Sequence, residues 1–332
     1  MSVVKAAVSY LVAGVTLAHA ALAAEHIKVG MQKTTSPIYV AQERGYFAAE
    51  GLEVEFVYFE AGQPVAVASV SGDIDFGIAG ITGGLYGLGE QGALKLIAGQ
   101  TREQPGFRAN TVVASNKAWA AGLKTMKDLP GHSVAVTQIG SAFHYDLGLL
   151  AEKYGFDLKT IRIMPLQTNP NSVAAVSGGS ADAAISLVTY LMPAIERGDA
   201  KLLGFIGDET PWQLVGVFTA TKTTNDRPET VKHFLAAFRK ATRDYHDAFT
   251  GPDERRHDGP SAPEILAIVS KYTGQTPQQV SDGIGYIDRD ARIDVADIDH
   301  QVAWYKAQNL VKGELTGAQM IDLRYAIPLA AK

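Results

Sequence analysis

The chain carries the same succession of segments twice, about a hundred residues apart. The first copy covers 27–78 and the second covers 134–185. In each copy an apolar run leads through a polar turn into a helical stretch, a glycine, another apolar run and a second helical stretch. Each copy ends on an aspartate before a short strand, Asp75 in the first and Asp182 in the second. Strands that alternate with helices are typical of parallel α/β units. We therefore predict two α/β lobes with a cleft between them, an architecture suited to holding a small molecule.

Length and composition agree with two folded lobes. The chain has 332 residues, which exceeds one typical core, and it is 46% hydrophobic and 20% charged. A net charge of −5 without a long Lys/Arg cluster argues against a nucleic-acid surface, so no nucleic-acid partner is expected. The chain contains no cysteine, which excludes thiol catalysis, thiolate metal sites, disulfides and a lipid-anchored lipoprotein.

The N-terminal segment has the pattern of a secretory signal. Lys5 precedes an uncharged, Ala-rich run over 6–22, and Ala21-Leu22-Ala23 supplies small residues at a cleavage site. We predict a signal peptide over 1–23, cleaved after Ala23, and a periplasmic protein. A single transmembrane anchor is the alternative, although the run barely reaches the roughly 20 residues that a span requires.

The remaining segments predict the boundaries of the lobes. The first lobe is expected over 26–112 and 216–332, and the second over 113–215. Two crossings of the chain, near 100–115 and 207–218, would form the hinge. Runs at 75–79 and 94–99 are expected to be buried parallel strands. From Pro228 onward the pattern is mostly helical, and these helices are expected to pack on the first lobe, whereas 251–263 is expected to be a solvated loop.

The motifs of catalysis are absent from the sequence. There is no phosphate-binding loop and no His-Glu-x-x-His, and the glycines of 80–87 do not have dinucleotide-binding spacing. The eight histidines are scattered without a metal-ligand pair, so neither a metal nor a cofactor is expected. Asp75 and Asp182 occupy equivalent places in the two copies, which indicates a structural role at the junction of helix and strand rather than a catalytic pair. We predict a binding protein and not an enzyme.

The starts of several predicted helices indicate where a ligand would bind. Ligands of open parallel sheets bind beyond the carboxyl ends of the strands, where the following helices begin. Helices are predicted to start at Ser36, Gly62-Gln63, Ser141 and Asn171-Ser172, with further turns at Thr82 and Ser186. Helix starts present unpaired N–H groups and a positive partial charge, so their convergence favours an anion. An aromatic wall would complete the site, although each of its members could instead belong to a core, Phe143 above all: Tyr39, Phe143, His144, Tyr190 and Trp212.

Several blocks of the sequence resemble a known family. The block Ser36-Pro37-Ile38-Tyr39-Val40-Ala41-Gln42-Glu43-Arg44-Gly45-Tyr46-Phe47 is similar to the opening of the nitrate/sulfonate/taurine-type ABC-transporter substrate-binding proteins, a family that includes binders of thiamine pyrimidine precursors. Similar blocks occur at 71–77, 127–131, 179–183, 286–304 and 322–325. The resemblance implies a type II periplasmic binding protein with two Rossmann-like lobes, expected to act as a monomer that delivers its ligand to an inner-membrane ABC permease.

The resemblance and the helix starts together predict the ligand-binding residues. The expected ligand is a small organic anion, a sulfonate or a carboxylate, and no motif selects among such ligands. The predicted ligand-binding residues are Thr35, Ser36, Tyr39, Gln63, Gly80, Ile81, Thr82, Gln138, Gly140, Ser141, Ala142, His144, Ser186, Leu187 and Trp212.

Two other functions remain open from the sequence. One is an enzyme of the same fold, similar to pyrimidine-precursor synthases or desulfinases, although the cysteines on which those relatives depend are missing. The other is a ligand-sensing receptor for a membrane regulator, which the residues do not distinguish from a transport protein.

Overall fold

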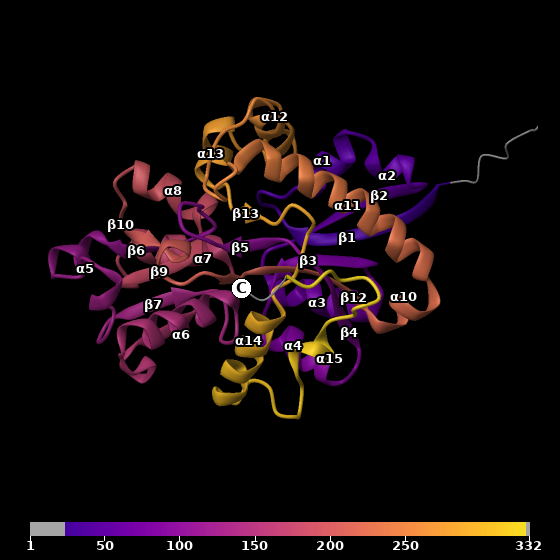
Figure 1. The fold of residues 1–332 in the computed structure, drawn as a ribbon. Helices are drawn as coiled ribbons and strands as arrows, with labels where there is room; N and C mark the ends of the chain where they lie inside the picture. The colour runs from indigo at the N-terminus through magenta and orange to yellow at the C-terminus, as the bar shows by residue number, and fades with distance from the viewer. Residues whose placement is uncertain (1–23, 330–332) are drawn as a thin grey trace, which may run out of the picture.

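The computed structural model describes residues 24–329 and shows two α/β lobes side by side (Figure 1). Each lobe contains a five-stranded sheet, and a three-stranded sheet lies between the lobes. Among residues 24–329 no helix combines the length and apolar character needed to cross a membrane. The predicted signal peptide, 1–23, lies outside the described residues.

The sheet of the first lobe has the order β2-β1-β3-β12-β4. Its strands are β1 (Glu25–Gln32), β2 (Leu52–Phe59), β3 (Phe76–Gly80), β4 (Leu94–Gly99) and β12 (Val215–Ala220). β1 is parallel to β2 and β3, whereas β12 is antiparallel to both of its neighbours. The predicted strand at 94–99 therefore exists, but its pairing was predicted incorrectly, because the returning strand β12 separates it from β3.

The sheet of the second lobe repeats this plan, with the order β10-β6-β9-β7-β8. Its strands are β6 (Asn110–Ser115), β7 (Ser133–Val136), β8 (Arg162–Pro165), β9 (Ala183–Leu187) and β10 (Ala200–Phe205). β7 is parallel to β8 and β9, and β6 is antiparallel to β9 and β10. In each lobe one antiparallel strand, β12 or β6, arrives from the hinge and completes the sheet.

Asp75 and Asp182 have equivalent structural roles, as predicted. The Asp75 carboxylate accepts a hydrogen bond from the backbone N–H of Lys28 in β1 at 2.7 Å. The Asp182 carboxylate accepts one from the backbone N–H of Ser133 in β7 at 2.8 Å. Each aspartate thus ties the start of β3 or β9 to the first strand of its copy of the repeat, β1 or β7.

Helices cover both faces of each sheet. Those before residue 210 are α1 (Ile38–Glu43), α2 (Tyr46–Ala49), α3 (Gly62–Ser71), α4 (Gly83–Glu90), α5 (Asn116–Ala120), α6 (Ala142–Tyr154), α7 (Asn169–Ser177), α8 (Val188–Glu196) and α9 (Ile206–Glu209), with short 3₁₀ helices at 126–128 and 158–160. Ser141 caps α6 as predicted, by accepting a hydrogen bond from the His144 N–H. α7 begins earlier than predicted, because Thr168 caps it by accepting from the Asn171 N–H.

Three strands cross between the lobes. They are β5 (Thr101–Glu103), β11 (Trp212–Gln213) and β13 (Tyr286–Ile287), with β5 in the middle. The two predicted crossings correspond to β5 and β11. The third strand was not predicted, because it is only two residues long and lies in a region whose pattern is mostly helical. The loop at 251–263 also reaches this sheet, where the Tyr286 hydroxyl donates to the Glu254 carboxylate at 2.6 Å.

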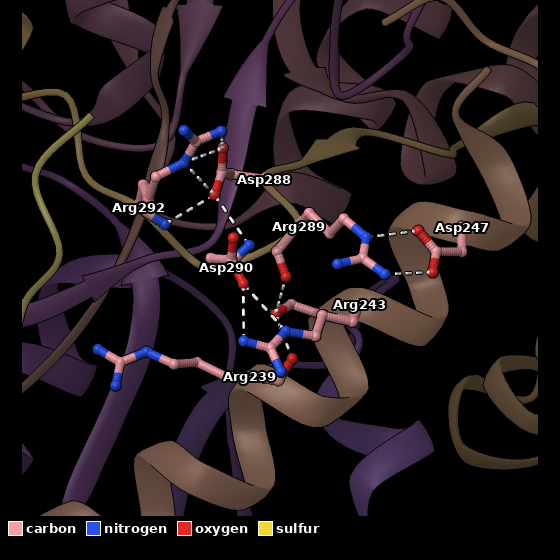
Figure 2. A network of polar contacts seen from close by, with 8 residues as sticks. Arg239, Arg243, Asp247, Asp288, Arg289, Asp290 and Arg292 are labelled. Atoms are coloured by element: carbon pink, nitrogen blue, oxygen red, sulfur yellow. Dashed lines mark hydrogen bonds and ion pairs between the residues drawn. The ribbon is translucent and has the colours of Figure 1, made fainter. Parts of the chain in front are cut away.

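A network of ion pairs holds the segment after β13 (Figure 2). Asp288 is buried and accepts hydrogen bonds from the backbone N–H groups of Asp290 and Arg292 and from the Arg292 guanidinium. Arg289 pairs with Asp247 at 2.9 Å, and Arg243 pairs with Asp290 at 2.8 Å. Burial opposes ionisation of Asp288, but the bonds from Arg292 outweigh it and lower the pKa of the carboxyl. The hinge strand is thereby anchored to α11 (Pro228–Phe249).

The C-terminal helices contact both lobes, which differs from the prediction that they pack on the first. They are α10 (Thr221–Asp226), α11, α12 (Ala262–Thr273), α13 (Pro277–Asp282), α14 (Val295–Ala307) and α15 (Gly317–Met320). α13 packs on α8 of the second lobe, and α14 packs on both α4 and α6 (Figure 1). One hydrophobic cluster includes Trp304 and Tyr305 of α14 together with Tyr145 of α6.

Candidate functional site

A cavity lies between the lobes at the ends of the strands, next to the hinge sheet. Both lobes, the hinge strands and the segment before β13 contribute to its wall. Its lining residues are Met31, Gln32, Thr34, Thr35, Gly62, Gln63, Ile78, Ala79, Gly80, Thr82, Gln100, Thr101, Ala109, Asn110, Thr137, Gln138, Ser141, Ala142, Phe143, Leu187, Val188, Thr189, Leu214, Val215, Tyr245, Gly283, Gly285 and Ile287.

The wall is largely apolar, with polar side chains at intervals, and it carries no formal charge. Among the described residues that line the cavity there is no Asp, Glu, Lys, Arg or His. Two arginines near the first crossing, Arg102 and Arg108, do not line the cavity. Arg102 pairs with Asp294 at 2.9 Å, and the Arg108 guanidinium lies over the Phe205 ring. No group of acidic, histidine or cysteine side chains within 24–329 is arranged to hold a metal ion.

Four helices begin at the wall of this cavity. The first residues of α3 line it, as do the N-caps of α4 and α6 and the first residues of α8. The first N–H groups of a helix have no partner within that helix and carry a positive partial charge. An uncharged cavity with four helix starts in its wall is therefore suited to a small anion.

The lobes touch each other directly across the cleft. The Gly83 N–H of the first lobe donates to the Gly140 carbonyl of the second at 2.8 Å. A Cβ at Gly80 would lie 3.3 Å from the Ala142 Cβ, so the two backbones approach closely at the cavity wall. The Tyr305 hydroxyl of α14 lies 3.4 Å from the Ile81 carbonyl and 3.3 Å from that of Ser141, and it bridges the lobes. The structure thus has the closed arrangement of the two lobes.

The structure brings part of the predicted set together at the cavity. The predicted residues that line it are Thr35, Gln63, Gly80, Thr82, Gln138, Ser141, Ala142 and Leu187. Gln63 and Thr82 come from different helix starts, and the Thr82 hydroxyl donates to the Gln63 side-chain carbonyl at 2.8 Å. Thr82 also accepts from the Leu85 N–H, which caps α4.

The other predicted residues lie outside the lining. They are Ser36, Tyr39, Ile81, Gly140, His144, Ser186 and Trp212. Ser36 is buried and donates to the Gln100 side chain at 3.0 Å, and Gln100 lines the wall. The Ser186 hydroxyl donates to Asn169 at 2.9 Å, and the Tyr39 ring stacks on Tyr272.

His144 supports the loop at which the lobes meet. Its Nδ1 accepts a hydrogen bond from the Gly140 N–H at 3.0 Å, and its ring packs edge-on against Trp304. Burial lowers the pKa of His144 from 6.5 to about 4, so the imidazole is neutral at pH 7 and can accept this bond. Gly140 has φ +81°, a backbone conformation that glycine adopts readily.

Trp212 is buried and does not line the cavity. Its indole N–H donates to Oδ1 of Asp146 at 2.9 Å, and both residues are buried. The other oxygen of Asp146 accepts from the Asn110 side chain at 2.8 Å, and the Asn110 backbone N–H donates to Glu103 at 2.8 Å. Burial raises the pKa of both Asp146 and Glu103.

Sequence reasoning missed many lining residues, and two groups of them differ in whether the sequence could have indicated them. Thr137 and Thr189 follow strands of the second lobe, so the rule of strand ends could have found them. Asn110 begins the antiparallel strand β6, and Leu214 directly precedes the antiparallel strand β12. No local signal in the sequence indicates the direction of those strands, so these positions could not be derived from it.

Comparison with known proteins agrees with this architecture. Residues 32–254 match the model of the family described as NMT1/THI5 like. A putative aliphatic sulfonates-binding protein of Bacillus subtilis (strain 168) is 28% identical over 222 residues, which cover 65% of this chain and 64% of that protein. The match therefore spans less than two thirds of the relative's length.

Two solved structures share the fold over most of their length. The periplasmic aliphatic sulphonate binding protein SsuA from Escherichia coli has a TM-score of 0.69 at 20% identity, over 93% of this chain and 94% of that one. The alkanesulfonate-binding protein SsuA from Xanthomonas axonopodis pv. citri, bound to MOPS, has a TM-score of 0.71 at 20% identity, over 90% and 98%. The predicted periplasmic binding protein fold is confirmed.

Proposed function

Because this chain belongs to the NMT1/THI5-like family, we propose that it is the extracytoplasmic solute-binding component of an ABC uptake transporter. Its ligand is a small organic anion, a sulfonate or a carboxylate, held in the cavity between the lobes. The observation that carries this proposal is the uncharged cavity wall with four helix starts. The names of the sulfonate-binding relatives agree with an anionic ligand.

The helix starts supply only part of the binding energy. One helix start stabilises an anion by roughly 0.3–1 kcal/mol when exposed and up to about 2 kcal/mol when partly buried. Four of them contribute several kcal/mol, whereas micromolar affinity requires about 8 kcal/mol. The remainder comes from hydrogen bonds of the polar side chains and from apolar contact with residues such as Phe143 and Leu187.

Closure of the lobes links binding to delivery. In the proposed mechanism the open lobes capture the anion. Rotation about the three hinge strands then closes the cleft over it and brings Gly83 of the first lobe against Gly140 of the second. The closed monomer then docks on an inner-membrane permease from the periplasmic side. The protein binds its ligand and does not convert it.

Titration calorimetry with a panel of ligands tests the proposal. Small alkanesulfonates, arylsulfonates and aromatic carboxylates should include a ligand that binds with micromolar or higher affinity. Binding of neutral pyrimidines, with no heat from any anion in the panel, would refute an anionic ligand. Mass spectrometry of the ligand after incubation should return it unchanged, and a product would instead indicate an enzyme.

A variant of the wall tests the location of the site. In Gly80→Leu the new side chain points at Ala142 across the cleft, so it should hold the lobes apart and abolish binding. Val67→Leu, on the exposed face of α3, is the matched control and should bind as the wild type does. Equal affinities of the two variants would place the ligand outside this cavity.

A further inference from the structure

Helix α14 carries a hydroxyl that contacts both lobes at once. Tyr305 is fully buried and does not line the cavity. Its hydroxyl lies 3.4 Å from the Ile81 carbonyl of the first lobe and 3.3 Å from the Ser141 carbonyl of the second. A tyrosine hydroxyl has a single proton, so the two carbonyls share one donor. Ile81 directly precedes the N-cap of α4 and Ser141 is the N-cap of α6, so this hydroxyl joins two helix starts of the cavity wall.

Buried polar bonds fasten α14 to the first lobe and to the hinge. The Tyr86 hydroxyl of α4 donates to the side-chain carbonyl of Gln301 at 3.0 Å. The NH₂ group of Gln301 donates to the Gln213 carbonyl in hinge strand β11 at 2.9 Å. The Gln213 N–H in turn donates to the Asp297 carboxylate at 2.8 Å. These bonds fix the place of α14 relative to the first lobe.

The same helix also binds the second lobe (Figure 1). Trp304 fills the space beside Gly148 of α6, where a Cβ would lie 2.3 Å from the indole. The indole packs edge-on against His144 and Tyr145, at centroid distances of 5.1 and 5.2 Å. The Tyr145 hydroxyl lies 2.7 Å from Nδ1 of His300. Helix α14 thus joins the two lobes through contacts that the chain makes with itself.

Opening of the cleft would break this arrangement whichever lobe α14 follows. Ile81 and Ser141 belong to opposite lobes, so rotation separates their carbonyls and the Tyr305 hydroxyl can remain with only one of them. Leu310, which follows α14, packs against both Gly83 and Gly140, since a Cβ on either glycine would lie 3.4 Å from it. Rotation would separate these two glycines as well. The contacts of α14 and Leu310 therefore favour the closed arrangement independently of any ligand.

We propose that α14 is a strap that holds the lobes closed before a ligand arrives, and that Tyr305 is a positioning residue of this strap. The closed form is the resting state, and brief openings admit and release the ligand. A weaker strap therefore speeds both entry and release but changes the affinity little, because the ligand-free and ligand-bound forms lose the same contact. This inference rests on the closure described for the proposed function, but not on the chemistry of the ligand.

Distances between two spin labels test the strap without a ligand. The chain has no cysteine, so Val67→Cys on α3 and Leu202→Cys on β10, at exposed positions of opposite lobes, each carry one label. In this doubly labelled parent the main separation should be that of the closed structure. Tyr305→Phe weakens the closed form alone, because water reaches both carbonyls in the open form, so the population at longer separations should rise about 2- to 10-fold. A parent found mainly at longer separations, or an unchanged distribution in Tyr305→Phe, would overturn the proposal.

Tyr325→Phe is the matched control. The Tyr325 ring is also buried, and its hydroxyl donates to the Thr224 carbonyl of α10 at 2.8 Å, so this bond stays on the side of the first lobe. The variant loses a buried hydroxyl but no contact between the lobes, and it should keep the distribution of the parent. An equal shift in Tyr325→Phe would trace the effect to general destabilisation and refute the role of Tyr305.

Stopped-flow kinetics with the panel of alkanesulfonates, arylsulfonates and aromatic carboxylates supply the second test. For each acid that binds, the association and dissociation rates of Tyr305→Phe should both rise by about 2- to 10-fold, with Kd within about twofold of the wild type. A dissociation rate that rises alone, with Kd rising by the same factor, would show that closure requires the ligand and would contradict a closed resting state. If no acid of the panel binds, the anion proposal fails, whereas the label distances still decide the strap.

Discussion

The variant Gly148→Ala, which adds one methyl group, should destabilise the protein, although replacing glycine by alanine inside most helices stabilises them. Gly148 lies inside α6, and a Cβ there would come within 2.3 Å of Cε2 and Nε1 of Trp304. The indole cannot easily move, because it packs edge-on against His144, Tyr145 and Tyr305 at centroid distances of 5.0–5.2 Å. Overpacking of this kind costs about 1–3 kcal/mol, which exceeds the gain of about 1 kcal/mol in helix propensity.

Gly87→Ala is the matched control for Gly148→Ala. Gly87 also lies inside a helix, α4, and a Cβ there would meet no atom within 4 Å. This variant should gain about 0.5–1 kcal/mol. In thermal unfolding followed by circular dichroism the two variants should shift the midpoint in opposite directions, by about 2–4 °C per kcal/mol for a lobe of ordinary size. A rise in both midpoints would show that α14 gives way freely at Trp304 and would refute the reasoning.

Three further perturbations concern polar side chains that hold the fold together. Because the pKa of His144 is lower in the folded protein, its contribution to stability is complete above pH 6.5 and is lost as the pH falls toward 4, by about 2–3 kcal/mol. His144→Gln should remove this loss of stability at low pH. If urea unfolding of the variant shows the same pH profile as the wild type, His144 is not its cause. Trp212→Phe should lower the free energy of unfolding by about 1–3 kcal/mol and raise the pKa of Asp146 further, because Asp146 loses a donor. Trp119→Phe, at a half-buried indole, is its control and should have little effect. Asp75→Ala and Asp182→Ala should each cost about 1–3 kcal/mol in chemical denaturation, and a loss confined to one of them would contradict their equivalence.

The repeat in the sequence was sufficient to predict the two lobes and the roles of Asp75 and Asp182. These two predictions depend only on the order of neighbouring segments in the sequence, because an apolar run, a capped helix and a glycine recur in the same succession. The helix starts at Gly62 and Ser141 were predicted for the same reason, since their start signals lie within a few residues of each helix.

The parts that were not predicted depend on contacts between distant segments. Nothing local indicates that β12 enters the first sheet between β3 and β4, or that Tyr286 and Ile287 pair with β5. Asn110 lies at the cavity only because β6 runs antiparallel to β9. Trp212 was predicted to be part of the cavity wall, but the buried carboxyl of Asp146 binds its indole N–H away from the lining.

The position of β12 also has a consequence for how the protein matures. The strands of the second sheet all come from one uninterrupted stretch, 110–205, so that lobe is complete as soon as this stretch is available. The first sheet differs, because β4 pairs within it only with β12 and lacks that neighbour until residues 215–220 have been made. While the chain is made from its N-terminus, the edge of β4 therefore stays unpaired until roughly a hundred more residues have been added. Unpaired sheet edges promote association between chains. The later lobe in the sequence is the earlier one to finish folding.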